Sequence, residues 1–174
     1  MKQLKYFILT VLSLLLIALV LALFLPRGIE VESTVVIDRN QQQVFNFIKK
    51  IKNQRHYAVW YDIDPYVHQE FVGVDGTIGF RYKWKSDLYA SGEMVITNID
   101  EGRRLDLTAY ISDYETVAYA EIITFPIDAK QTRVIWRTHS EIPYPKNLFL
   151  FGKNIQKQYD DGLVKLKEHL ENLP

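Results

Sequence analysis

The chain has no cysteine among its 174 residues. Disulfide bonds, cysteine-ligated zinc or iron–sulfur centres and a thiol nucleophile are therefore excluded. An excess of one charge is also missing, because 21 basic side chains balance 21 acidic ones and the formal net charge is zero. A nucleic-acid backbone is bound through surplus positive charge, so we expect no nucleic-acid partner.

Signatures of metal and nucleotide chemistry are absent as well. The four histidines are scattered along the chain, and none has a partner at the spacing that zinc sites use. No serine occurs in a nucleophile-elbow sequence, and no glycine-rich phosphate loop is present. We expect no cofactor and no metal site, and the scarcity of catalytic groups favours a function without chemistry.

The first 28 residues differ in composition from the rest of the chain. Positions 6–25 contain no charged residue, glycine or proline, and Leu, Ile, Val, Ala and Phe dominate them. At about 1.5 Å per residue this run makes a helix of roughly 30 Å, the thickness of the hydrocarbon core of a bilayer. Lys2 and Lys5 precede it, and the positive-inside rule then predicts a cytoplasmic N-terminus. We predict a single-pass anchor and short linker over 1–28, with residues 29–174 outside the cytoplasmic membrane.

A cleaved signal peptide is the main alternative, because it also combines a basic start with an apolar segment. The apolar region of a cleaved signal usually spans about 7–15 residues, which is shorter than this run. A buried core helix is a further alternative. The anchor and the signal peptide both predict that the rest of the chain is exported.

Residues 29–174 alternate between apolar and polar side chains over most of their length. Ile29–Asp38 has the pattern of a strand, and Gln41–Lys52 has the spacing of a short amphipathic helix. Apolar residues three and four apart predict a long helix from about Leu148 to Asn172. Between these helices, turn residues separate six further alternating runs: His68–Val74, Thr77–Lys85, Tyr89–Ile99, Arg103–Ser112, Thr116–Asp128 and Gln131–Ile142.

The gaps between the alternating runs are too short for helices, so the strands must be antiparallel. A curved sheet of about seven strands, closed by the long C-terminal helix, is the compact solution. The predicted class is α+β.

Six segments of the chain follow one another in the order seen in a known superfamily: VESTVVIDRNQQQVFNFI, RHYAVWYD, GTIGFRYKWKS, SGEMVIT, TRVIW and YDDGLVKLKEHLE. In this order they resemble SRPBCC proteins, which include START lipid-transfer, birch-allergen-like and polyketide cyclase/dehydrase-type domains. The resemblance extends from Ile29 to Pro174 and is closest to the membrane-anchored, polyketide-cyclase-like members. It implies a helix-grip fold with a deep apolar cavity between the sheet and the C-terminal helix. It implies no particular reaction, because one fold hosts many functions.

Alternation within the strands predicts which side chains line such a cavity. In Thr77–Lys85 the rings share one face and the basic residues Arg81, Lys83 and Lys85 share the other. A wall of rings with few ionisable groups suits an apolar or aromatic small molecule or a lipid, although the rings could instead fill a solid core. The candidate ligand-binding residues are Trp60, Tyr61, Phe80, Tyr82, Trp84, Met94, Leu107, Ala109, Tyr119, Glu121, Trp136 and Tyr159.

Glu121 is the weak candidate for a catalytic residue. It shares a strand face with Val117, Tyr119, Ile123 and Phe125. If that face meets the cavity, burial raises the pKa of the carboxyl group and fits it for general acid or base catalysis. A shift in the phase of the strand, or a solvated sheet edge, would instead leave Glu121 in water.

Three functions are compatible with these patterns. The leading one is a membrane-anchored binding module for a hydrophobic small molecule or lipid, held between the sheet and the C-terminal helix. The others are a cyclase- or dehydratase-type enzyme that uses the same pocket, and a cell-envelope interaction protein without a ligand. The run Leu148–Phe151 has four consecutive apolar residues, more than one helix face can bury. We expect part of it at the cavity entrance or the bilayer surface, unless it packs against the aromatic segment at 53–65.

Overall fold

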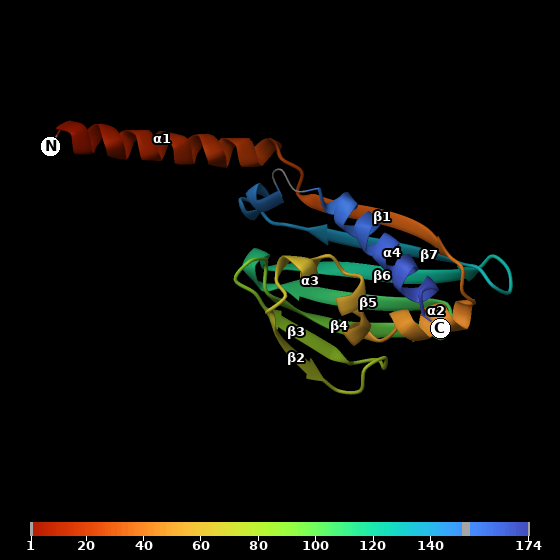
Figure 1. Ribbon diagram of the computed structural model, residues 1–174. Helices are drawn as coiled ribbons and strands as arrows, with labels where there is room; N and C mark the ends of the chain where they lie inside the picture. The colour runs from red at the N-terminus through yellow and green to blue at the C-terminus, as the bar shows by residue number, and fades with distance from the viewer. Residues whose placement is uncertain (1, 151–153, 174) are drawn as a thin grey trace.

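The computed structural model describes residues 2–150 and 154–173, and within them a single antiparallel sheet of seven strands forms the centre of the molecule (Figure 1). The strand order across the sheet is β1-β7-β6-β5-β4-β3-β2. The strands are β1 (Gly28–Ile37), β2 (His68–Val72), β3 (Arg81–Lys85), β4 (Gly92–Asp100), β5 (Arg104–Ile111), β6 (Thr116–Pro126) and β7 (Thr132–Glu141). Each strand lies within or next to a run predicted from alternation, so the predicted helix-grip architecture is confirmed.

Helices lie before, between and after the strands. The α-helices are α1 (Lys2–Phe24), α2 (Gln41–Ile48), α3 (Trp60–Ile63) and α4 (Ile155–Glu171), and the short 3-10 turns are η1 (Ile51–His56), η2 (Ser112–Tyr114) and η3 (Lys146–Leu150). Helix α4 crosses one face of the curved sheet (Figure 1).

The C-terminal helix is shorter than its predicted range of Leu148 to Asn172. Helix α4 begins at Ile155, where the side chain of Asn154 caps it by accepting a hydrogen bond from the backbone N–H of Lys157. The separate turn η3 holds Lys146–Leu150. Within the apolar run Leu148–Phe151, Phe151 lies outside the described residues.

A solid core fills the end of the domain next to α2. Phe45 and Ile48 of α2 pack there with Leu166 and Leu170 of α4 and with inward-facing residues of the central strands. Gly162 lets α4 approach closely, because a Cβ at this position would lie 3.3 Å from the carbonyl oxygen of Tyr57. The opposite end of the sheet is less completely filled.

The outer face of the sheet carries charged side chains that form ion pairs between strands, as the alternation predicts. Arg81 lies 2.7 Å from Glu93 on the neighbouring strand, and Lys83 lies 3.6 Å from Glu70. These cross-strand pairs leave the opposite, ring-bearing face of β3 for the interior.

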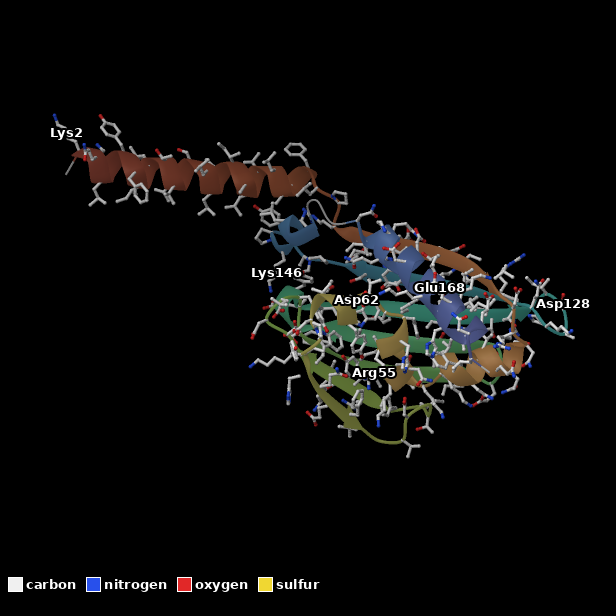
Figure 2. The ribbon with its side chains drawn as sticks, in the orientation of Figure 1. Lys2, Arg55, Asp62, Asp128, Lys146 and Glu168 are labelled. Atoms are coloured by element: carbon white, nitrogen blue, oxygen red, sulfur yellow. The ribbon has the colours of Figure 1, made fainter. Side chains whose placement is uncertain are left out.

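Helix α1 projects from the end of the domain where β1 begins (Figure 1). It is long and apolar enough to cross a membrane, and almost none of its surface is covered by the domain. A signal sequence near an N-terminus can also be long and apolar enough to meet this criterion. In Figure 2, Lys146 lies near this end of the domain and Asp128 marks the opposite end.

Candidate functional site

A cavity of about 400 Å³ lies between the inner face of the sheet and the N-terminal half of α4. Its wall includes Ile29 at the start of β1, Ile111 at the end of β5 and Ile142 just after β7. The register of the sheet places these positions at one end, because Gly28 pairs with Glu141 and Ile111 pairs with Thr116. The cavity therefore extends toward the end of the domain from which α1 leaves.

Seven aromatic side chains dominate the wall: Trp60, Tyr82, Trp84, Tyr89, Tyr114, Trp136 and Tyr159. Trp136 is central among them, with its ring edge-on to Tyr159 at 4.8 Å and to Trp60 at 5.9 Å between centroids. Tyr82 stacks on Trp84 at 5.3 Å. These contacts fix the rings against one another and give the wall a defined shape.

The position of the Trp84 ring depends on a glycine in the neighbouring strand. Gly92 pairs with Trp84 across strands β3 and β4, and a Cβ built on Gly92 would lie 2.7 Å from the Trp84 ring and 2.4 Å from the carbonyl oxygen of Tyr110. The indole N–H of Trp84 donates to the carbonyl oxygen of Ala90 at 2.7 Å. The ring can thus lie flat over the backbone of β4 at the cavity wall.

The void exists because small residues occupy the neighbouring strands. Ala109 on β5 and Ala118 and Ala120 on β6 face the cavity from the sheet. Larger side chains at these positions would fill the space between the sheet and α4. A cavity of this volume belongs to the size class of small-molecule sites, which starts at about 300 Å³.

The described lining residues include no aspartate, glutamate, lysine, arginine or histidine. Two polar atoms of lining residues are buried without a hydrogen-bond partner in the described part of the protein: the hydroxyl of Tyr89 and the indole nitrogen of Trp136. Leaving such a group unpaired costs about 1–3 kcal/mol. The cavity wall is therefore neutral, and it retains unused hydrogen-bonding capacity.

Burial keeps the tyrosine hydroxyls of the wall protonated. Desolvation, with smaller effects of Tyr61 and Asp64, raises the pKa of Tyr89 to about 12. Desolvation likewise raises the pKa of Tyr82, with Tyr61 adding to the effect. At neutral pH these groups can donate or accept hydrogen bonds, but they are not bases.

Eight of the twelve residues selected from the sequence line this cavity: Trp60, Tyr82, Trp84, Met94, Leu107, Ala109, Trp136 and Tyr159. Phe80 is buried in the core. Tyr61 packs against this core, with its ring stacked on that of Tyr82 at 6.5 Å between centroids. Neither Phe80 nor Tyr61 is among the residues that line the void.

The expected position of Tyr119 and Glu121 in the cavity is wrong. Both lie on the outer face of β6, where Tyr119 is 59 % exposed and a Glu121 carboxylate oxygen is 3.6 Å from a guanidinium nitrogen of Arg104. The inner face of β6 carries Ala118 and Ala120 instead. The large apolar residues of β6 pointed to the wrong face, because the inner face carries small residues, Ala118 and Ala120, where it borders the void.

Glu121 belongs to a second hollow, on the outer face of the sheet, with a volume of about 740 Å³. Its charged side chains neutralise one another in pairs: Arg137 lies 2.6 Å from Glu32, and Arg104 lies 2.5 Å from Asp106. This arrangement is typical of a solvated sheet face, and a carboxylate in it has no access to the inner cavity.

Several lining residues were not identified from the sequence. Leu88 and Tyr89 come from the connection between β3 and β4, and Tyr114 comes from η2. Strand periodicity says nothing about such connections. Gln158 lines the cavity one residue before Tyr159, and the apolar stripe of α4 excluded it because it is polar.

Comparison with known proteins agrees with this architecture. Residues 28–171 match the family described as polyketide cyclase / dehydrase and lipid transport. The chain belongs to this family. No curated protein matches it.

Solved structures show the SRPBCC-type fold of this polyketide cyclase / dehydrase family at low sequence identity. Truncated norcoclaurine synthase from Thalictrum flavum is similar with a TM-score of 0.64 and 8 % identity, over 84 % of this chain and 96 % of that one. A protein from Thermobifida fusca has a TM-score of 0.60 and 16 % identity, over 81 % and 92 %. Aha1 from Colwellia psychrerythraea has a TM-score of 0.57 and 12 % identity, over 83 % and 97 %. At these identities the likeness concerns the fold alone.

Proposed function

We propose that the chain is a membrane-anchored protein that binds a neutral hydrophobic small molecule or a lipid in the cavity between the sheet and α4. The observation that carries the proposal is the wall of this 400 Å³ cavity, which is built from rings and alanines and holds no charged side chain among the described residues. An ionised guest would lose its hydration without gaining a counter-charge there. An uncharged apolar guest gains burial at little cost.

The volume of the cavity and the polar atoms of its wall limit which molecules can bind. A cavity near the lower end of the range for small-molecule sites suits a single-chain lipid or a compound of one or two rings. The unpaired atoms at Tyr89 and Trp136 favour a bound molecule with one hydroxyl or carbonyl group. Norcoclaurine synthase has been solved in complex with dopamine and hydroxybenzaldehyde, so a protein of the same fold accepts ring compounds.

Helix α1 supplies the proposed membrane attachment. Its length and its uncovered apolar surface favour a bilayer-spanning helix, and Lys2 and Lys5 favour a cytoplasmic N-terminus. The cavity domain then lies outside the cytoplasmic membrane. Because only three residues separate the end of α1 from the start of β1, the domain stays close to the bilayer surface.

The available proton-bearing groups favour binding over acid–base catalysis. Glu121 is on the other side of the sheet, and burial raises the pKa values of Tyr82 and Tyr89 in the wall. A cyclase or dehydratase reaction in this pocket would lack a base among the described lining residues. The open void, in turn, argues against a purely structural role in the cell envelope.

Native mass spectrometry and solvent extraction of the full chain, purified in mild detergent, test the proposal. We expect bound single-chain lipid or ring compound to be released, and we expect the same compound to raise the melting temperature when it is added back. Ala109→Leu, which fills the cavity, should lose most of the bound compound. The matched control Ala129→Leu, in the exposed β6–β7 hairpin, should retain it.

The proposal fails if repeated preparations are empty and neither single-chain fatty acids and alcohols nor phenolic aldehydes and amines change the melting temperature. Equal retention in Ala109→Leu and in Ala129→Leu would show that any bound compound lies elsewhere.

A further inference from the structure

The end of α1 is attached to the domain by more than the chain connection. The side-chain amide of Asn147, in η3, donates to the carbonyl oxygens of Ala22 at 2.7 Å and Leu25 at 3.3 Å. The hydroxyl of Tyr144 donates to the carbonyl oxygen of Leu19 at 3.2 Å. Figure 1 shows η3, the short blue coil, beside the end of the helix.

The two bonds from Asn147 satisfy carbonyl groups at the end of α1 that would be costly to leave unpaired. The last four carbonyl groups of an α-helix have no partner within the helix. Near hydrocarbon, each unsatisfied backbone group costs several kcal/mol. Asn147 and Ala22 are both completely buried, and Ala22 is the one buried residue within the described helix Lys2–Phe24. A side chain of the domain, shielded from water, thus caps the end of the apolar helix.

The bonds also set the position of the segment from Tyr144 to Asn147 along the axis of α1. Leu19 precedes Leu25, the end of the apolar run, by six residues, which is about 9 Å along the helix axis. Elements that lie in a membrane interface are buried about 5–10 Å. Tyr144 is bonded at the level of Leu19, and Asn147 of η3 is bonded nearer the end of the run, at Ala22. Both bonded levels therefore lie below the end of the apolar run when that run fills the bilayer.

The chemistry of the segment fits an interface. Tyr144 carries the guanidinium of Arg27 over its ring at 5.9 Å, and aromatic and basic residues of this kind gather where headgroups begin. The sequence continues from Leu148 through an uninterrupted apolar run. Ile142 and Ile155, which flank the segment along the chain, both line the cavity.

We propose that residues 143–150 form a second membrane-contact element, which is immersed in the leaflet from which the domain emerges and fastened to α1 by Asn147 and Tyr144. The partner is the lipid bilayer itself. This inference rests on the proposed membrane anchor, and it adds that the cavity end of the domain is held against the acyl chains rather than suspended above the headgroups.

Depth measurements on the full chain test the inference, and the cysteine-free sequence allows one labelled cysteine at a time. The chain is reconstituted in vesicles of phosphatidylethanolamine and phosphatidylglycerol that carry nitroxide-labelled lipid. An environment-sensitive dye at Leu148→Cys should shift to the blue and lose most of its fluorescence to the nitroxide. The same dye at Ala129→Cys, in the distant hairpin, should do neither.

A third label at Leu15→Cys separates failure of the anchor from failure of the inference. If the Leu15 dye is quenched and the Leu148 dye behaves like the Ala129 dye, the second contact does not exist although the anchor does. If the Leu15 dye is also unquenched, the anchor is wrong and the inference falls with it.

Asn147→Leu tests the fastening, because it keeps the size of the side chain and removes both hydrogen bonds. We expect weaker quenching of the Leu148 dye in this background. The matched control Asn98→Leu removes an exposed hydrogen bond to Asp106 and should leave the quenching unchanged. Unchanged quenching in Asn147→Leu would refute the fastening. If that variant does not fold, the comparison of Leu148 with Ala129 still decides whether η3 contacts lipid.

Discussion

Gly92 shows how one small residue shapes the cavity. The Trp84 ring lies against its backbone, and the carbonyl oxygen of Tyr110 closes the space from the neighbouring strand. The absence of a side chain lets a large ring form part of the wall without displacing the sheet. Ala109, Ala118 and Ala120 act similarly, since the void occupies the space that larger residues would take.

Gly92→Ala should destabilise the domain and disturb the cavity. The new Cβ would collide with backbone as well as with the Trp84 ring, and overpacking of this kind costs about 1–3 kcal/mol. Chemical denaturation of the variant gives the loss in the free energy of unfolding. Tryptophan fluorescence reports the displaced ring.

Gly28→Ala is the control, because a Cβ at that position has only one atom within 4 Å, at 4.0 Å. Its unfolding free energy should stay close to that of the unmodified chain. Equal stability of both variants would contradict the close contact at Gly92.

At the level of elements, sequence periodicity located the strands but not the phase of every strand. On β3, apolar rings alternate with arginine and lysines, so the inner face is unambiguous. On β6 both faces are largely apolar, and the inner face carries alanines while the outer carries Tyr119. The sequence-based prediction placed the larger apolar residues of β6 inside. The inner face beside the cavity instead carries the smaller ones.

The connections set a second limit on what the sequence could predict. Tyr89 reaches the cavity from the segment between β3 and β4, where no period applies. The range predicted for the closing helix included Leu148, because its spacing continues the apolar stripe of α4. In the structure that residue belongs to η3, beside α1. The sequence shows that it is apolar, but not that α1 lies next to it.

Leu166→Ala tests how far α4 contributes to the fold. Leu166 is fully buried between α4 and the sheet, and removal of such a side chain costs about 2–5 kcal/mol. Val164, two residues earlier, is 50 % exposed on the same helix. Val164→Ala should change stability by less than about 0.5 kcal/mol. Urea unfolding of the two variants measures both values, and similar losses would contradict the packing of α4.

For the whole molecule, the distribution of charge separates the two parts of the chain. The first 28 residues contain three basic side chains and no acidic one, so the remaining 146 have 18 basic and 21 acidic groups. A domain of this mildly negative sign gains no general attraction to anionic headgroups. In the proposed arrangement, α1 and the segment bonded to it hold the domain near the bilayer.

Intact mass and labelling of whole cells test the proposed topology. We expect the mass of the uncleaved chain in the membrane fraction, and we expect extraction to require detergent rather than alkaline carbonate. A membrane-impermeant maleimide should label Ala129→Cys in cells whose outer barrier is opened, but not Lys2→Cys. A smaller mass, matching a chain that starts beyond residue 20, would instead identify α1 as a cleaved signal peptide.

The hydrogen bonds from η3 to the end of α1 connect the helix and the domain at a second point, in addition to the chain itself. Transmembrane helices tilt when their apolar length exceeds the local bilayer thickness. If α1 spans the membrane as proposed, it tilts in a thinner bilayer, and the domain fastened to it rotates as well. The thickness of the membrane then sets the angle between the cavity domain and the bilayer surface.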